Sequence, residues 1–130
     1  MNKLKQLPQN IIGFLLSRKN TNSIYYNIYE NETTKVYFKK NFFKSGISLG
    51  DYIILDEIHN ILPKEMLFNA IKHEHGHQLQ SQKYGWLYLL IIGLPSLCGN
   101  IISRIFNKSN DWYYSQPWEH NADVLGKVER

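Results

Sequence analysis

The chain has 130 residues, of which 43% are hydrophobic, 14% aromatic and 20% charged, with a formal net charge of +4. This composition excludes intrinsic disorder and predicts a single domain, 1–130, with a modest core. The basic residues are scattered and match no nucleic-acid-binding motif, so no nucleic acid partner is expected. A single cysteine, Cys98, excludes internal disulfides and a cysteine-rich zinc site. Because it stands in an apolar run, Cys98 is predicted to be a small buried side chain.

Residues 1–22 predict an N-terminal helix or arm. Apolar residues gather at 11–16, but Pro8-Gln9-Asn10 interrupts the run and no Ala-x-Ala sequence follows, which argues against a secretory signal. A short helix that packs by its Ile, Phe and Leu side chains is favoured, and 20–23 predicts a turn. The expected location is cytoplasmic or membrane-associated.

The next segments predict a small sheet. Residues 24–29 and 34–40 are rich in β-forming residues and flank a polar turn at 30–33, which indicates a hairpin. After a break at 44–46, residues 47–55 predict a third strand.

A helix is predicted from Pro63 to Lys83 or Tyr84, ending at Gly85. It carries His-Glu-x-x-His, which a shuffled chain of this composition would contain roughly 0.01 times. Residues four apart share one helical face, so His73 and His77 can bind one metal ion. Glu74 lies one step round the helix, where a general base is needed.

Two other histidines are assigned no metal. His75 lies about 200° round the helix from His73 and therefore cannot share an ion with it. His59 follows two acids and is interpreted as a loop or helix-start residue without a role. Gly76 permits close approach of another backbone, for which a strand is one candidate.

The segment Trp86–Ile102 is the most ambiguous, since no charged residue occurs between Lys83 and Arg104. Its length meets the criterion for a membrane span. However, Pro and Gly interrupt its second half, and 94–96 (Leu-Pro-Ser) predicts a break between two buried pieces. A hydrophobic core hairpin, or a patch that touches a membrane, is favoured over a true span.

A second site helix is predicted to begin at Pro117. Glu119 and Asp123 are then i and i+4 on one face, where Glu119 can be the third metal ligand and Asp123 can accept a hydrogen bond from a ligand histidine. The alternative is two surface acids on an amphipathic helix. Tyr114 and His120 are candidates to stabilise an oxyanion, although aromatic residues before a helix are more often packing residues.

These residues resemble a known family. His73-Glu74 with His77, then Glu119 and Asp123, resembles the gluzincin pattern of zinc metallopeptidases. The longer run of His-Glu-His-Gly-His-Gln-Leu-Gln-Ser, the apolar segment, and Pro-Trp-Glu with Ala-Asp is similar to small bacterial metallopeptidase domains. Some of these stand at the C-terminal ends of Rhs-type and other polymorphic toxins. The similarity covers most of the chain, about residues 46–126.

The resemblance implies that His73, His77 and Glu119 bind zinc, with Glu74 as catalytic acid/base and Asp123 as a supporting residue. Two imidazoles and a carboxylate also favour zinc by ligand type. We therefore predict an α+β fold: a small antiparallel sheet packed on the metal-site helix, then an apolar helical hairpin and a second site helix. The expected function is zinc-dependent hydrolysis of a peptide or protein substrate, with use as a bacterial toxin or effector implied by resemblance.

Two alternatives stay open. In the first, the domain is a catalytically inactive zinc-binding interaction module. In the second, it is a membrane-associated component that acts through residues 86–102. The sequence predicts no oligomeric state.

Overall fold

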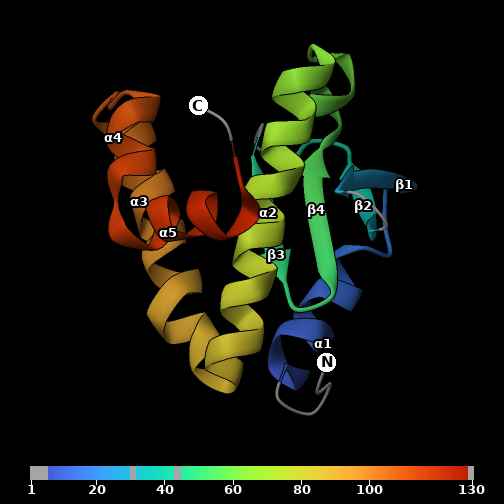
Figure 1. Cartoon of the computed structure of the whole chain (residues 1–130), viewed down its shortest axis with the longest axis horizontal. Helices are drawn as coiled ribbons and strands as arrows, with labels where there is room; N and C mark the ends of the chain where they lie inside the picture. The colour runs from blue at the N-terminus through green and yellow to red at the C-terminus, as the bar shows by residue number, and fades with distance from the viewer. Residues whose placement is uncertain (1–5, 30–31, 43–44, 129–130) are drawn as a thin grey trace.

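The computed structural model describes residues 6–29, 32–42 and 45–128, and it confirms the α+β class (Figure 1). Helix α2 runs through the middle of the molecule, between a four-stranded sheet and a layer made by α3, α4 and α5. The elements in chain order are α1 Leu7–Leu16, β1 Thr21–Tyr29, β2 Glu32–Lys39, β3 Gly46–Leu49, β4 Tyr52–Asp56, η1 Glu57–Ile61, α2 Lys64–Tyr84, η2 Gly85–Leu87, η3 Leu89–Gly93, α3 Leu94–Ile105, α4 Asn110–Ser115 and α5 Pro117–Gly126.

The sheet has the order β1-β2-β4-β3. β1 pairs with β2 and β3 with β4 in antiparallel fashion, whereas the two hairpins join through a parallel β2–β4 pair. β1 starts at Thr21, so the turn predicted at 20–23 is wrong beyond Asn20, whose φ is +56°. Residues 30–31 of the turn predicted between the first two strands lie outside the described residues. The same holds for Lys44, the first residue of the predicted break at 44–46.

The single strand predicted at 47–55 is wrong, because a turn at Gly50-Asp51 divides it into β3 and β4. Gly50 has a φ of +61°, which suits the first central position of a two-residue hairpin turn. Asn10 of α1 holds this turn, since its Oδ1 accepts a hydrogen bond from the Asp51 N–H at 2.7 Å. The split places β3 at one edge of the sheet.

The main core lies between α2 and the sheet. Alternate residues of β2, Val36 and Phe38, point into it together with Ile53 and Leu55 of β4. α2 contributes Leu67 and Ile71, one turn apart, whereas Met66, which the sequence placed on the same stripe, is 55% exposed. α2 begins and ends as predicted, after Pro63 and before Gly85.

Helix α1 confirms the predicted N-terminal helix but packs by the opposite face. Gln9 and Gly13 face inward, and Gln9 Nε2 donates to the Gly85 carbonyl at 2.6 Å and to Ser81 Oγ at 3.1 Å. A Cβ on Gly13 would lie 2.7 Å from the Tyr52 ring, so only glycine allows this close approach. The apolar face expected to pack is exposed.

The expected helical hairpin is present, with its bend of 120° between α2–η2 and η3–α3 rather than at 94–96. Pro95 lies in the first turn of α3, where a missing N–H is tolerated, and η3 runs directly into α3. The predicted burial of this segment is wrong for its outer side, and Cys98 is exposed as well. Among the described residues, no single helix is long and apolar enough to cross a membrane, although this bent pair meets the length and composition criteria together.

Candidate metal centre

The candidate site is built where α5 crosses α2. Gly76 of α2 and Gly126 of α5 let the two backbones touch: a Cβ on Gly76 would lie 1.9 Å from the Ala122 carbonyl oxygen, and one on Gly126 would lie 1.9 Å from the Lys72 carbonyl oxygen. The close approach expected at Gly76 is therefore made by a helix and not by a strand. It brings the acids of α5 over the histidines of α2.

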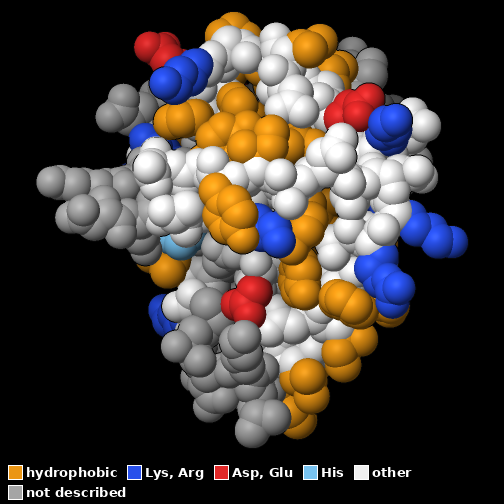
Figure 2. Space-filling view, turned by 90° about the vertical axis from the view of Figure 1, so that its right-hand side faces the viewer, with side chains coloured by type: hydrophobic (Ala, Val, Ile, Leu, Met, Phe, Trp, Pro, Cys, Tyr) orange, Lys and Arg blue, Asp and Glu red, His pale blue; other side chains and the backbone are white. Residues whose placement is uncertain are grey.

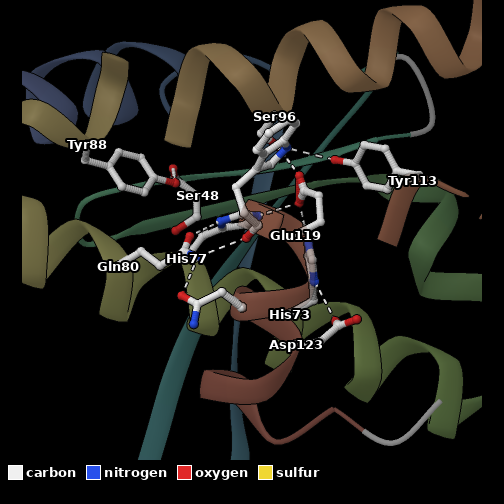
Figure 3. Close-up of polar contacts among 11 residues, drawn as sticks. Ser48, His73, His77, Gln80, Tyr88, Ser96, Tyr113, Glu119 and Asp123 are labelled. Atoms are coloured by element: carbon white, nitrogen blue, oxygen red, sulfur yellow. Dashed lines mark hydrogen bonds and ion pairs between the residues drawn. The ribbon is translucent and has the colours of Figure 1, made fainter. Parts of the chain in front are cut away.

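Three side chains converge at this crossing (Figure 3). Glu119 Oε1 lies 3.0 Å from His73 Nε2 and 2.8 Å from His77 Nε2. All three residues are buried, and one ligand atom from each falls within 4.8 Å of the other two. This buried group can bind a metal ion.

The far nitrogen of each imidazole faces an acceptor. His73 Nδ1 lies 2.7 Å from Asp123 Oδ1, the partner expected from the sequence, and His77 Nδ1 lies 2.6 Å from Gln80 Oε1. The Gln80 amide is oriented because its Nε2 donates to the Trp118 carbonyl at 2.9 Å. Sequence reasoning missed Gln80; its position three residues after His77, on the same helical face, was the available signal.

These contacts test whether the residues fit a metal ion. Each Nδ1 carries a proton toward an oxygen, so in the neutral rings each Nε2 presents a lone pair to Glu119 Oε1. Three lone pairs that meet in a buried space require a cation or a proton between them. Two imidazole nitrogens and a carboxylate oxygen, each with its own supporting hydrogen bond, make a suitable metal-binding set.

The second oxygen of Glu119 is held by the apolar segment. Ser96 Oγ donates to Glu119 Oε2 at 2.7 Å and lies 3.3 Å from Tyr113 Oη. Sequence reasoning missed Ser96, because it was read only as part of a chain break. These bonds leave Oε1 directed at the two imidazoles (Figure 3).

Glu74 is buried beside this group and is not part of it. Within the described part of the chain, its Oε2 is buried without a hydrogen-bond partner. Burial raises the pKa of the carboxyl group above 4.5, although the nearby histidines act in the opposite direction. A Cβ on Gly46 of β3 would lie 3.3 Å from Glu74 Oε1, so a bare glycine backbone makes room for the carboxylate.

Two cavities meet at Glu74 and Gly46. One, of about 340 Å³, also includes His73 and Tyr114, and the other, of about 250 Å³, includes His77. Both lie between edge strand β3 and the inner face of α3. A ligand can therefore reach both histidines and Glu74 from a groove along β3.

Tyr114 and the three histidines outside the metal-binding group lie at different distances from the cavities. The Tyr114 ring packs edge-on against His73 with centroids 5.1 Å apart and borders the first cavity, while His120 is exposed and borders neither cavity. His75 lies outside the metal-binding group, and its Nδ1 is 2.9 Å from Gln78 Oε1. His59, interpreted as having no role, borders the first cavity, with its Nδ1 3.0 Å from the Asp56 carbonyl.

Two pKa values show how strongly the metal-free site is coupled. Burial disfavours a charge on His73, but hydrogen bonds to Asp123 and Glu119 outweigh it and raise the pKa of His73 to about 9. Burial would raise the pKa of Glu119, yet hydrogen bonds from His73 and His77 hold it far below 4.5. Near neutral pH, the metal-free centre therefore contains a protonated His73 imidazole beside the Glu119 carboxylate.

We expect the metal-free protein to lose stability as pH rises from 6.5 to 9. The pKa of His73 is raised from 6.5 to about 9, so its contribution is complete below pH 6.5 and disappears as the pH passes about 9. The raised pKa of Glu74 also lowers the free energy of unfolding as the pH rises above 4.5. The lowered pKa of Glu119 stabilises the folded protein, and this contribution is lost only in acid. Urea unfolding with chelator present should show a decrease of about 3 kcal/mol between pH 6.5 and 9. A free energy of unfolding that is constant over this range would mean that His73 is neutral.

Comparison of the chain with protein-family models, with curated proteins and with solved structures finds no match.

Proposed function

We propose that the chain is a zinc-dependent peptidase in which Glu74 is the general base. The observation that carries this proposal is the unpaired Oε2 of Glu74, buried next to the convergence of His73, His77 and Glu119. A purely structural metal site needs no free carboxylate oxygen at this position. A hydrolase needs one.

Zinc held by this set would supply a Lewis acid that polarises a carbonyl and lowers the pKa of water toward ~7. Glu74 takes a proton from the attacking water at Oε2, because this oxygen has no competing donor among the described residues. As the water oxygen bonds to the carbonyl carbon and the C–N bond breaks, Glu74 returns the proton to the leaving nitrogen. The raised pKa of its buried carboxyl group suits this double task.

Strand β3 supports a peptide as the substrate. β3 is an edge strand, and Ser45 and Ile47 pair with Asp56 and Ile54 of β4. By the alternation of an antiparallel ladder, the main-chain groups of Gly46 and Ser48 point away from β4. Tyr88 Oη donates to the Ser48 carbonyl at 3.1 Å, which leaves Gly46, beside Glu74, to pair with an extended chain.

Tyr114 is the better of the two proposed oxyanion residues, because it borders the first cavity and contacts the His73 ring. His120 keeps this role only if α5 or its side chain moves, since it is exposed. Tyr113 borders both cavities and is a third candidate.

The proposal is tested with a diverse peptide mixture analysed by mass spectrometry. Cleavage products are expected from protein that contains zinc, loss of cleavage after treatment with chelator, and recovery when zinc is added back. Zinc bound stoichiometrically without cleavage of any peptide would instead favour the inactive interaction module.

A further inference from the structure

We propose that α1 and the η2–α3 segment form a surface that inserts into the interface of an anionic lipid bilayer. This inference does not rest on the proposed peptidase activity. It rests on which faces of two helices are buried and on where the acidic residues lie in the chain.

Helix α1 packs on the protein by its polar face and exposes its apolar face. Its inward face carries Gln9 and Gly13, with Gln6 buried just before the helix, whereas its outward face carries apolar residues spaced by four, three and one. These are Leu7, Ile11, Phe14 and Leu15, between 44% and 61% exposed. Surface helices normally bury such a stripe. In α1 the polar face is the buried one, so the apolar stripe is free to contact a partner or a membrane.

Helix α3 repeats this arrangement. Its inward face carries Ser96, Gly99, Asn100 and Ser103, and three of these four border the cavities of the candidate site. Its outward face carries Leu94, Leu97, Ile101 and Ile105, between 46% and 70% exposed. The preceding turns add Trp86, Leu87 and Leu90, each more than half exposed. The turns η2 and η3 connect this face to α1, because η2 packs against α1 and η3 packs against both η2 and α3.

The two segments are neighbours in space. The bond from Gln9 Nε2 to the Gly85 carbonyl ties α1 to the start of η2, and the two elements pack together. Helix α1 and the turns η2 and η3 lie at the lower end of the molecule in Figure 1, and α3 rises from there along the side away from the sheet. Apolar side chains reach the lower end in the turned view of Figure 2. Of the described residues, all large apolar side chains that are exposed fall in or near these segments or on β1, except Ile61, Met66 and Val124.

The charge distribution favours an anionic bilayer as the occupant. No Asp or Glu occurs in residues 1–29 or 75–110, although these stretches contain both apolar segments. Their cations include Arg18, Lys19, Lys83, Arg104 and Lys108. A second copy of the same face would bring like charges together, whereas an anionic headgroup layer attracts them.

The lengths favour insertion into the interface. α1 has 10 residues, and η3 and α3 together run from Leu89 to Ile105, so at ~1.5 Å per residue both are shorter than a hydrocarbon core of ~30 Å. Exposed apolar faces with basic residues in the same segments and an exposed tryptophan are the pattern of helices that lie in the plane of the interface. The inner face of α3 would then hold the groove close to the membrane surface.

The test is co-sedimentation of the full chain with vesicles of phosphatidylcholine alone or mixed with phosphatidylglycerol. Binding is expected only with phosphatidylglycerol, weakened by salt, and accompanied by a blue shift of Trp86 emission that Trp86→Phe removes. The double variant Ile11→Ser/Leu90→Ser should bind at least about ten-fold more weakly. The matched control Ile61→Ser/Met66→Ser, also at exposed sites, should bind as the unchanged chain does.

Equal loss in both double variants, or equal binding to both kinds of vesicle, would overturn the proposal. It would also be overturned if the chain ignored vesicles and formed a dimer that Ile11→Ser/Leu90→Ser dissociates in size-exclusion chromatography. A monomeric chain that binds neither kind of vesicle would overturn the proposal as well.

Discussion

Replacement of Glu74 by Gln is expected to leave zinc binding unchanged and to lower the rate of peptide hydrolysis by about a hundred- to ten-thousand-fold. The amide fills the same buried space beside Gly46 but cannot accept a proton from water. His73, His77 and Glu119 keep their contacts, since Glu74 is outside the metal-binding group. The measurement is metal content by elemental analysis together with the cleavage rate of a substrate found in the peptide mixture.

Glu65→Gln is the matched control for this variant. Glu65 is an exposed acid in the first turn of the same helix, so its replacement should alter neither metal content nor rate. Full activity of Glu74→Gln would exclude Glu74 as the base. If the chain also acts as a toxin, growth arrest on expression should disappear in Glu74→Gln and persist in Glu65→Gln.

The part of the site that was predictable depends on local helix geometry. His73 and His77 are four residues apart on one helix, and Glu119 and Asp123 are four apart on another, so each pair shares a face wherever the helices lie. Pro117 and the pair Pro63 and Gly85 also mark the helix boundaries that the structure has. What the sequence could not specify was how the two helices cross.

The residues that were missed depend on that crossing. Gln80 supports His77 because α5 brings the Trp118 carbonyl to its amide, and Ser96 reaches Glu119 because α3 folds back over α5. Neither contact follows from the spacing within one helix. The wrong expectation for 86–102 has a similar cause: hydropathy identifies apolar residues, but it does not say which face of a helix packs inward.

The helix crossing itself depends on two glycines. Because the Gly76 and Gly126 backbones touch the opposing helices, the distance between α2 and α5 is set by main-chain contact and not by adjustable side chains. That distance decides whether Glu119 Oε1 reaches both imidazoles. A substitution that separates the helices should therefore damage stability and metal binding together.

Gly76→Ala is expected to lower the free energy of unfolding by about 3 kcal/mol, the upper end for overpacked sites, and to weaken zinc binding by about ten- to a hundred-fold. The added methyl group would lie 1.9 Å from the Ala122 carbonyl oxygen, and neither helix backbone can yield without moving Glu119 away from the histidines. The higher helix propensity of alanine, worth at most about 1 kcal/mol, is too small to compensate.

Gly99→Ala in α3 is the matched control. Outside its own helix backbone, the added methyl group would meet no atom closer than 3.9 Å, so this variant should keep or gain stability. Urea unfolding and zinc titration of both variants measure the difference. If Gly76→Ala matched Gly99→Ala in stability and in zinc affinity, α2 and α5 would not cross at this distance.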